Sequence, residues 1–333
     1  MKNQNELSII AEIGLNHEGS IECAKKLLTE AASTGVQYVK FQSYTTEKYA
    51  AANDPARITR LKKFSLTRDH FYELASLANS LNVKFISTPL SEDWVELLNP
   101  IVSLFKIASG DITFKPVIEA AALTGKPLII STGAATISEI DQAVEWVKNI
   151  VGASLLSERL TLMHCVAAYP TPIDQANLHS IPFLKEKYKL NIGYSNHVMG
   201  MNACITAVAL GASPIEVHYT DNKHDREFRD HALSFDFADL KSFVTLANVV
   251  RSSLGTFEKK VQDCEKEIIP NIRKGIIAKK NLAKGHVLTK EDLAFARPGT
   301  NFKSSELDLI IGKKLSEEVQ EGFLIPKNSV ILS

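Results

Sequence analysis

Short apolar runs alternate with longer helical segments over most of this chain, and this alternation limits the fold more than any other feature. The runs lie at residues 8–13, 36–41, 83–87, 104–108, 127–130, 160–164, 190–194 and 214–217. Segments with helical periodicity separate them, among them residues 21–33, 69–81, 137–150, 203–211 and 237–254. Strands that alternate with helices indicate parallel β-α units, and apolar strands indicate a sheet buried on both faces. Eight such units in about 250 residues predict a (β/α)8 TIM barrel, with a doubly wound open sheet as the structural alternative.

The pattern changes near residue 255. Residues 256–274 are rich in charge and are expected to form a linker. Residues 275–333 hold short β-like runs separated by turn residues, which predicts a small β-rich domain. Such a small domain buries little core by itself, so we expect it to pack on the barrel or on a second chain. The predicted organisation is a barrel domain over residues 1–255, a linker over 256–274 and a second domain over 275–333.

Composition excludes several classes of protein. Lys+Arg and Asp+Glu both number 38, so the chain lacks the basic excess that is typical of nucleic-acid-binding proteins. The sequence has no apolar run long enough for a membrane span, and its first residues show no signal-peptide pattern, so we expect a cytoplasmic protein. The four cysteines, Cys23, Cys165, Cys204 and Cys264, show no CxxC pairing and are expected to be free thiols.

Polar side chains follow every predicted strand, which is where barrels of this type carry their chemistry. Lys40 and Lys106 lie in apolar runs. They suggest an anion clamp in the barrel mouth, or else lysines whose charged ends reach solvent at a strand end. Hydroxyl or glycine turns follow three neighbouring strands and together could donate to a phosphate, although each alone is an ordinary helix cap. These turns contain Ser87, Thr88, Ser109, Gly110, Ser131, Thr132 and Gly133.

Two histidines follow the seventh and eighth strands and are candidate metal ligands. His197 and His218 are one β-α unit apart, which places them side by side on the rim of the barrel. Imidazole nitrogens at that position can bind a divalent metal and leave coordination sites open for water or substrate. Two hydrogen-bonded loop histidines are the alternative. Glu216 is expected to point inward or to orient one of the imidazoles.

The remaining polar residues near the rim carry weaker patterns. His164 is expected to be structural, and His224 and His231 are expected to be solvated or capping, while His17 and Glu18 stay undecided. The two lysines and the two rim histidines suggest a metal-assisted reaction of a substrate that is phosphorylated or carboxylated. Phosphoenolpyruvate carries both groups.

Ordered sequence motifs run along nearly the whole chain. In the barrel they are IIAEIGLNHEGS (9–20), VKFQSY (39–44), FISTPL (85–90), FKIASGD (105–111), IISTGA (129–134), HCVAAYPTP (164–172), GYSNH (193–197), EVHYT (216–220) and DHALSFD (230–236). In the C-terminal part they are NIRKGIIAKKNLAKGHVLT (271–289) and ARPGTNF (296–302). With these motifs the chain resembles a known family, the sialic (nonulosonic) acid synthases, in which a phosphoenolpyruvate-condensing barrel is joined to a C-terminal SAF or antifreeze-like (β-clip) domain.

The resemblance implies a ligand set for each substrate. The residues at the positions of phosphoenolpyruvate ligands are Lys40, Gln42, Thr88, Lys106, Ser109, Ser131 and Ser195. The residues at the positions that meet the acceptor sugar are Glu12, Asp111, Tyr169, Asp230 and Arg297. The resemblance makes His197 and His218 the ligands of a divalent ion of the Mn²⁺ type, with Mg²⁺ or Co²⁺ as alternatives. The residues expected to act in catalysis are Glu12, Lys40, Lys106 and His218.

The resemblance also implies an assembly. In the family, an arginine of the SAF domain reaches the active site of the partner subunit in a domain-swapped homodimer, and Arg297 matches it. Arg297 precedes Pro298-Gly299, a turn sequence that places its side chain at a loop tip.

The implied activity is that of a transferase. It condenses phosphoenolpyruvate with an N-acetylmannosamine-type hexosamine and water to give a nine-carbon sialic acid and phosphate. A 2,4-diacetamido-trideoxyhexose acceptor, giving legionaminic or pseudaminic acid, is the alternative. Three departures from the family pattern leave the acceptor open: Val166-Ala167 where a Thr-Asn pair is common, Asp111 where many relatives have Glu, and a charged loop at residues 226–229. Two other readings compete, namely a Schiff-base aldolase using Lys40 or Lys106 and a sugar-binding protein without catalysis.

Overall fold

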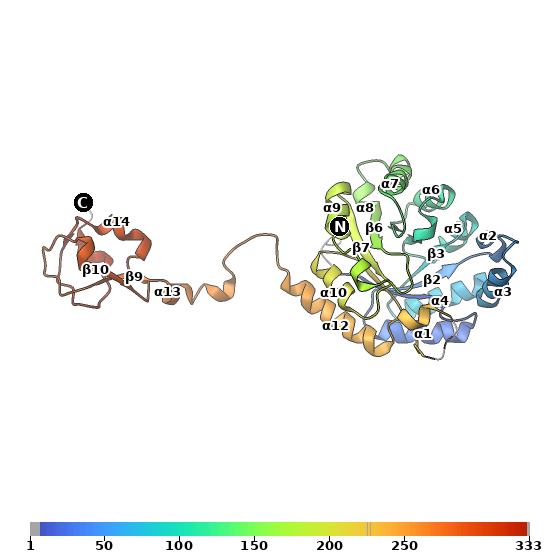
Figure 1. The fold of residues 1–333 in the computed structure, drawn as a ribbon, viewed down its shortest axis with the longest axis horizontal. Helices are drawn as coiled ribbons and strands as arrows, with labels where there is room; N and C mark the ends of the chain where they lie inside the picture. The colour runs from blue at the N-terminus through green and yellow to red at the C-terminus, as the bar shows by residue number, and fades with distance from the viewer. Residues whose placement is uncertain (1–6, 225, 227, 332–333) are drawn as a thin grey trace. The chain divides into compact units, whose positions relative to one another are not determined.

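Eight parallel strands close into a barrel in chain order, and β8 pairs with β1 (Figure 1). The predicted TIM barrel is therefore confirmed, and the open sheet is wrong. The structure is a computed structural model that describes residues 7–224, 226 and 228–331. The strands are β1 (Ile9–Gly14), β2 (Tyr38–Ser43), β3 (Lys84–Pro89), β4 (Phe105–Ile107), β5 (Leu128–Ser131), β6 (Leu160–Cys165), β7 (Asn191–Asn196) and β8 (Ile215–His218).

Helices follow the strands and cover the outside of the barrel (Figure 1). The five helical segments expected from periodicity begin and end within two residues of observed helices, and Thr136 forms the capping box with Glu139 that starts α7. The helices are α1 (Ile21–Ser33), α2 (Thr46–Tyr49), α3 (Pro55–Phe64), α4 (Arg68–Ser80), α5 (Glu92–Leu98), α6 (Lys115–Leu123), α7 (Ile137–Val151), α8 (Leu156–Arg159), α9 (Ser180–Tyr188), α10 (Asn202–Ala209), α11 (Asp230–Leu233) and α12 (Phe237–Ser253). No helix in the described part of the chain is long and apolar enough to cross a membrane.

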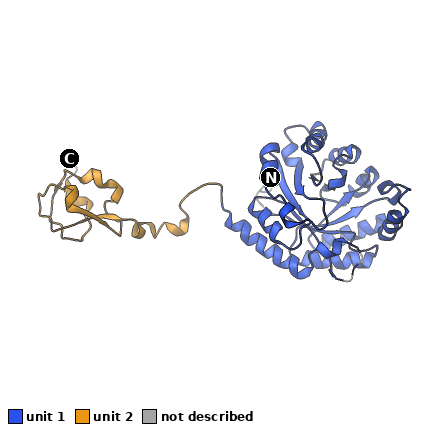
Figure 2. Ribbon diagram, viewed as in Figure 1, with its two compact units in different colours: residues 1–255 blue, residues 256–333 orange. Residues whose placement is uncertain are grey.

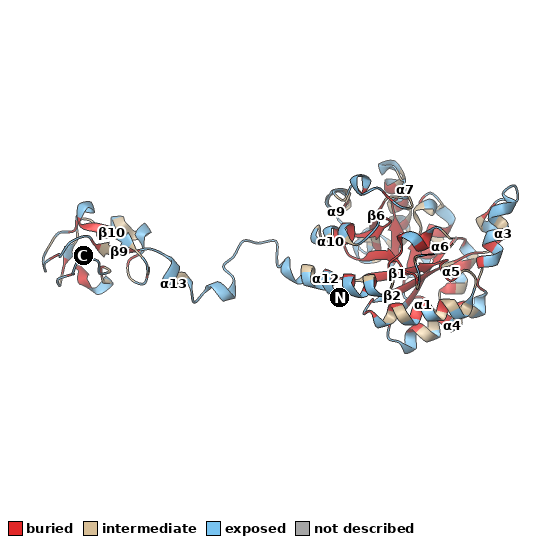
Figure 3. Cartoon of the chain, turned by 60° about the horizontal axis from the view of Figure 1, so that its bottom comes forward, coloured by how far each residue is buried: buried red, intermediate tan, exposed pale blue. Residues whose placement is uncertain are grey.

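The strands are buried on both faces, as their apolar runs predict (Figure 3). Their outward side chains pack against the helices in one large core cluster. Their inward side chains change in character along the barrel, because residues two apart in a strand share a face. Apolar residues fill the lower interior, among them Ile10, Ile86, Leu104, Ile129 and Met163. The residues two positions later are Glu12, Thr88, Lys106, Ser131 and Cys165, so the interior becomes polar towards the carboxyl ends of the strands.

The strand register brings charged residues of neighbouring strands to one level. Glu12 of β1 is paired with Lys40 of β2 on one side and with His218 of β8 on the other. Ser195 of β7 is paired with Glu216 of β8. These pairs set the geometry of the polar layer at the top of the barrel.

The chain divides into two compact units, residues 1–255 and residues 256–333 (Figure 2). In the second unit, β9 (Gly275–Ala278) pairs antiparallel with β10 (Leu293–Ala296), and β11 (Lys314–Leu315) pairs with β12 (Val330–Ile331). Two short helices, α13 (Ile269–Ile272) and α14 (Leu307–Ile310), complete it. This unit has a small core of its own, built from residues such as Ile276, Leu288, Ile310 and Ile325.

Candidate active site

A cavity of about 1340 Å³ opens at the carboxyl ends of the barrel strands. Every predicted site residue of the barrel lines it, so the structure brings these residues together. They are Glu12, Lys40, Gln42, Thr88, Lys106, Ser109, Asp111, Ser131, Tyr169, Ser195, His197, His218 and Asp230. Arg297 belongs to the second unit, where it is exposed and its Nε donates to the carbonyl of Ile272 at 2.9 Å.

Lys40 is a buried cation with two carboxylates beside it. Its side chain is 5% exposed, and its Nζ lies 2.9 Å from Glu12 Oε2 and 3.5 Å from Glu216 Oε2. It also donates to Thr88 Oγ1 at 3.3 Å. Burial lowers the pKa of Lys40, but the two carboxylates outweigh burial and hold that pKa above its usual value. Lys40 therefore stays charged inside the barrel, and it is not a strand-end lysine that reaches solvent.

Lys106 is equally buried but has no carboxylate at ion-pair distance among the described residues. Its Nζ donates to Ser131 Oγ at 2.6 Å and to the carbonyl of Ile107 at 3.0 Å. Burial lowers the pKa of Lys106, Glu216 opposes this effect, and the nearby charge of Lys40 adds to it. A buried ammonium group that faces a cavity without a counter-ion is suited to bind an anion there.

Glu216 is a functional candidate whose contacts sequence reasoning missed. Its Oε1 accepts a hydrogen bond from Ser195 Oγ at 2.9 Å, and its other oxygen faces Lys40. Burial alone would raise its pKa, but Lys106 and Lys40 hold it near 2, so the carboxylate is charged. Glu216 points into the barrel, as expected, but among the described residues its hydrogen-bond partner is Ser195 and not an imidazole. The paired register of Ser195 and Glu216 is the structural reason.

Small residues surround the lysines with hydrogen-bond donors. Ser109 Oγ accepts from the backbone N–H of Gly133 at 3.0 Å. A Cβ at Gly133 would lie 2.8 Å from that Oγ, so a side chain at this position would displace Ser109. Gln42 Nε2 donates to Glu12 Oε1 at 3.1 Å. Asp111, at the same edge of the cavity, has its pKa raised to about 6 by burial, which Lys106 partly opposes.

His197 and His218 lie next to each other, with ring centroids 5.4 Å apart. His197 Nδ1 is 2.7 Å from the carbonyl oxygen of Val166, so this nitrogen donates its proton and the Nε2 atom carries the lone pair. Burial, followed by the neighbouring His218, lowers the pKa of His197 to about 3, so the ring is neutral. The partner of His197 is a backbone carbonyl, so this contact does not depend on the side chain at position 166. Val166, in place of the threonine that is common in the family, therefore leaves the contact intact.

The two imidazoles fit a divalent metal with open coordination sites. His218 Nδ1 is buried and has no hydrogen-bond partner among the described residues, and Asp230 Oδ2 is 3.9 Å away. Within the described part of the chain, no group of three or more His, Cys, Asp or Glu side chains could hold a metal. The protein would therefore supply two nitrogen ligands, and water or substrate would supply the rest.

An aromatic ring and a guanidinium group lie beside the histidines at the cavity wall. The Tyr169 ring lies 3.9 Å from that of His197, centroid to centroid. The Arg229 guanidinium lies 4.7 Å from the Tyr169 ring centroid, and its Nε donates to Asp230 Oδ1 at 3.2 Å. Asp230 is thus held between Arg229 and His218 at the cavity wall.

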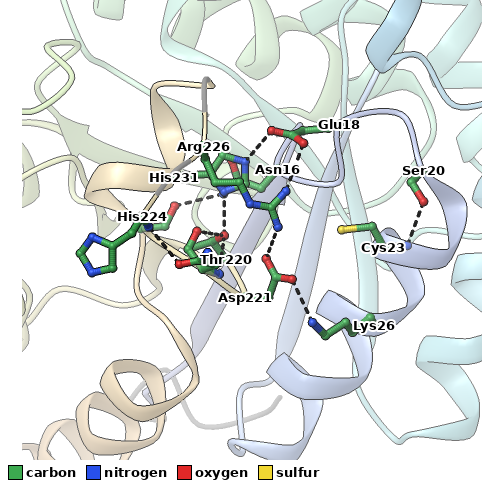
Figure 4. Close-up of polar contacts among 12 residues, drawn as sticks. Asn16, Glu18, Ser20, Cys23, Lys26, Thr220, Asp221, His224, Arg226 and His231 are labelled. Carbon is green, nitrogen blue, oxygen red and sulfur yellow. Dashed lines mark hydrogen bonds and ion pairs between the residues drawn. The ribbon is translucent and has the colours of Figure 1, made fainter.

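A polar network anchors the segment that carries Asp230 (Figure 4). His231 is fully buried, with Nδ1 2.7 Å from Thr220 Oγ1 and Nε2 3.3 Å from Glu18 Oε1. Arg226 bridges Glu18 at 3.1 Å and Asp221 at 2.8 Å. The expectation that His231 is solvated is therefore wrong, because Glu18 and Thr220 enclose it between the loops after β1 and β8. Glu18, which sequence reasoning left undecided, is one of the residues that join these loops, together with Asn16.

The other histidines have local roles. His17 is buried, and its Nδ1 accepts from the backbone N–H of Gly19 at 3.0 Å. His164 Nε2 is 2.8 Å from the carbonyl oxygen of Ala176, which fits the structural role expected for it. His224 is exposed, as expected.

Comparison with known proteins identifies the family of the barrel and of the second unit. A model of the NeuB family matches residues 27–259, and a model of the SAF domain matches residues 273–331. The chain belongs to the NeuB family. It is 40% identical to an uncharacterized protein of Methanocaldococcus jannaschii over 95% of this chain and 92% of that protein. It is 37% identical to an N,N'-diacetyllegionaminic acid synthase of Legionella pneumophila over 94% of this chain and 92% of that protein.

A solved structure also matches this chain. The N-acetylneuraminic acid (sialic acid) synthetase of Leptospira borgpetersenii, solved in complex with citrate, aligns with a TM-score of 0.74 at 35% identity. The alignment covers 80% of this chain and 91% of that one.

Proposed function

We propose that this NeuB-family protein is a nonulosonic acid synthase. It condenses phosphoenolpyruvate with an N-acetylmannosamine-type hexosamine and water, and it releases a nine-carbon sialic acid and phosphate. The observation that carries the proposal is the convergence of two buried lysines and two neighbouring imidazoles on one cavity. The relatives named as legionaminic acid and sialic acid synthases support the same reaction class.

The buried lysines suit a substrate with two anionic groups. Lys106, with Ser131 and Ser109 beside it, is placed to bind one anionic group of phosphoenolpyruvate, and Lys40 with Thr88 the other. Binding would raise the pKa of Lys106, because an anion replaces the missing counter-ion. With both ends of the substrate held, its C3 carbon is directed at the acceptor, and positioning of this kind is worth up to about 7–11 kcal/mol.

The reaction balances without a redox partner. A carbon–carbon bond forms between C3 of phosphoenolpyruvate and the aldehyde carbon of the open-chain sugar, water adds at C2, and cleavage of the C–O bond expels phosphate. A divalent metal on His197 and His218 would polarise the aldehyde oxygen as a Lewis acid, and Mn²⁺, Mg²⁺ or Co²⁺ could serve. Glu12 lies between Lys40 and Gln42, where it can accept a proton or orient water and sugar hydroxyls. Asp111, Tyr169 and Asp230 are placed to bind the acceptor.

Two alternatives lead to different products or intermediates. A 2,4-diacetamido-trideoxyhexose acceptor, giving legionaminic or pseudaminic acid, uses the same residues, and relatives that carry those names support it. A Schiff-base aldolase needs a neutral lysine, and the pKa of Lys40 is raised by its two carboxylates. Lys106, whose pKa is lowered, is the only chemically suitable lysine of the two, and borohydride trapping with the acceptor sugar would detect it.

The test of the proposed function is the release of phosphate from phosphoenolpyruvate in the presence of N-acetylmannosamine or a 2,4-diacetamido-trideoxyhexose. We expect turnover with at least one acceptor, its loss after EDTA treatment, and its recovery with Mn²⁺, Co²⁺ or Mg²⁺. Full activity in a metal-free preparation would overturn the metal assignment. Absence of turnover with every acceptor would overturn the function.

We further propose a homodimer in which Arg297 completes the partner's active site. Arg297 is exposed on the loop after β10, and the segment 256–274 exposes the apolar side chains of Phe257, Val261, Ile268 and Ile272. Apolar side chains gathered on an exposed segment indicate a surface that another chain can cover. The guanidinium group could then donate to hydroxyl or acyl oxygens of the sugar.

Subunit complementation tests this assembly. An Arg297→Ala chain is mixed with a His197→Ala chain under conditions of subunit exchange. If the site is shared, some heterodimers contain one intact site, and activity returns above that of either parent. Exchange confirmed by mass without any return of activity would exclude a shared site, as would an active monomer in sedimentation.

A further inference from the structure

Helix α3 forms part of the wall of the cavity and carries a one-sided charge. It contains four basic residues and no acidic residue. Arg57, Arg60 and Lys63 are exposed and line the cavity. Lys62 does not line it, and its Nζ is paired with Glu47 at 3.0 Å. Because the lysines deeper in the cavity are buried, the three exposed cations lie at its mouth.

Buried apolar residues on the opposite side of α3 anchor the helix and so hold these cations in position. Leu61 and Phe64 are buried in a separate apolar cluster. The Phe64 ring contacts that of Phe228 edge to face, with centroids 5.4 Å apart. The end of α3 also packs so closely on the loop after β1 that a Cβ at Gly19 would lie 2.0 Å from the carbonyl oxygen of Lys63. The helix is therefore anchored to the loops after β1 and β8, and its basic face is held towards the cavity.

The cations of α3 lack counter-ions. Among the described residues, no carboxylate forms an ion pair with Arg57, Arg60 or Lys63. The Arg57 guanidinium lies 5.0 Å from the Tyr49 ring centroid, and the Lys63 ammonium lies 5.8 Å from that of Phe64. The nearest acid in the chain, Asp54, uses its side chain to cap the helix by accepting from the backbone N–H of Arg57 at 3.1 Å.

A further cation reaches the same cavity from the loop after β8. The Arg229 side chain is 69% exposed and pairs with Asp230 while it lies over Tyr169. Since β8 and β2 both neighbour β1, the segments that follow them flank the same part of the rim. The mouth of the cavity thus carries an excess of positive charge, and such a field concentrates anions there.

The proposed reaction decides which substrate meets this charge. The reacting aldehyde must lie deep in the cavity, beside the residues that bind phosphoenolpyruvate, so the opposite end of the acceptor points to the mouth. We propose that the acceptor of this enzyme carries a phosphate monoester at the end remote from its aldehyde and that the cations of α3 bind that phosphate. Guanidinium and ammonium groups are the usual partners of phosphate. This inference rests on the proposed function.

The proposal distinguishes between the two acceptor classes. N-acetylmannosamine has a hydroxyl at C6 that can be phosphorylated. A 2,4-diacetamido-trideoxyhexose that is deoxygenated at C6 cannot carry a phosphate there. The basic face of α3 therefore favours a 6-phosphorylated hexosamine, and the product would be a nonulosonic acid with the phosphate retained.

The experiment compares three acceptors with the full-length protein: N-acetylmannosamine, N-acetylmannosamine 6-phosphate and a 2,4-diacetamido-trideoxyhexose. Consumption of phosphoenolpyruvate is followed by its ultraviolet absorbance. We expect kcat/KM for the 6-phosphate to exceed that for either neutral acceptor by about tenfold or more, as loss of a hydrogen bond to a charged group would give. Added salt should reduce this preference, because the mouth of the cavity is open to solvent.

Substitution of Arg60 then locates the phosphate site. Arg60→Ala should reduce the preference for the 6-phosphate by about tenfold. Lys62→Ala is the matched control, since Lys62 is basic, exposed and on the same helix but pairs with Glu47 away from the cavity. Its preference should match that of the natural chain, and thermal unfolding of both variants checks their fold.

Three results would overturn the proposal, and they separate it from the proposed function. If a neutral acceptor is preferred, the function stands and the phosphate site does not. If Arg60→Ala raises the KM for phosphoenolpyruvate and leaves the acceptor preference unchanged, the cations of α3 attract phosphoenolpyruvate instead. If phosphoenolpyruvate is consumed with no acceptor at all, the proposed function fails together with the inference.

Discussion

Both units of the protein bury charged side chains, but they satisfy them differently. In the second unit, Asp292 accepts from Lys280, His286 and both donors of Thr289, at distances of 2.7–2.8 Å. In the barrel, Lys106 donates to one side chain and one carbonyl among the described residues, and it faces a cavity. The first arrangement is closed, and the second leaves room for a ligand.

The difference separates a structural buried charge from a functional one. A buried charge with a full set of partners stabilises the fold that holds it, whereas an incompletely paired one costs stability unless a ligand completes it. The pKa directions agree with this view. Hydrogen bonds from Lys280 and His286 lower the pKa of Asp292 and keep it charged. Burial lowers the pKa of Lys106 and works against its charge.

The largest expected effect is on Lys106. Lys106→Met should lower kcat/KM for phosphoenolpyruvate by at least about a hundredfold, because removing one partner of a buried charge pair costs about 3–5 kcal/mol. The stability of the barrel should stay the same or increase, because an apolar side chain replaces a poorly paired charge. Steady-state kinetics and urea unfolding measure the two quantities.

A second lysine provides the control for that variant. Lys126 donates to the backbone carbonyls of Asn99 and Val102 just before β5, at the end of the barrel remote from the cavity. Lys126→Met should lower the free energy of unfolding by about 1–3 kcal/mol and leave kcat intact. Equal kinetic effects of the two variants would contradict the assignment of Lys106 to the substrate cavity.

The next effect concerns Asp292, the buried charge with a full set of partners. Asp292→Asn should lower the free energy of local unfolding of the second unit by about 1–3 kcal/mol. Because the folded-state pKa of Asp292 lies below its ordinary value, this stability is present at neutral pH and is lost as pH falls through the folded-state pKa. Hydrogen exchange of the Ile276 and Ile325 amides, which donate to Phe302 and Ile276, reports on that unit.

An exposed carboxylate of the same unit serves as the reference. Asp308→Asn should leave the exchange rates unchanged, since Asp308 is exposed on α14. If both variants behave alike, Asp292 does not stabilise the unit, and the contrast with the barrel fails.

A smaller effect should come from Glu18, which joins the loops at the cavity edge. Glu18→Gln removes the ion pair with Arg226 and weakens the contact with the buried His231 ring, and partly exposed ion pairs are worth about 0.2–1 kcal/mol. We expect the KM for the acceptor to rise about two- to fivefold while the KM for phosphoenolpyruvate is retained. Glu22→Gln, which alters an exposed pair with Lys25 on α1, is the control. Parallel changes in both KM values would show that Glu18 only stabilises the barrel.

The smallest effect is a pH dependence. Burial raises the pKa of Asp111 to about 6, so its carboxyl is charged above that pH and neutral below it. If the carboxylate binds the acceptor, kcat/KM for the acceptor should fall to about half its plateau at pH 6 and decline further in acid. The inflection should be missing in Asp111→Asn. A profile that is identical in the two proteins would remove Asp111 from the acceptor site.

Much of the barrel and its site could be predicted from the sequence, because a parallel strand places alternate residues on one face and its carboxyl end at one rim. This rule brings Lys40, Lys106, His197 and His218 to the cavity. It does not say which side chains meet across the barrel. The pairing of Lys40 with both Glu12 and Glu216 depends on the stagger of three strands. The burial of His231 depends on contact between loops that are more than 200 residues apart in sequence.

The sequence by itself determined the alternation of strands and helices, the inward positions of each strand and the chemical type of the residues at the strand ends, since these follow from local periodicity and composition. Only the tertiary structure decided which buried charges have a full set of partners and which face a cavity without a counter-ion. It also decided which cations of α3 face the cavity. The physical reason is that the energy of a charge inside a protein depends on all of its neighbours within a few ångströms. In a closed barrel those neighbours come from strands and loops throughout the chain.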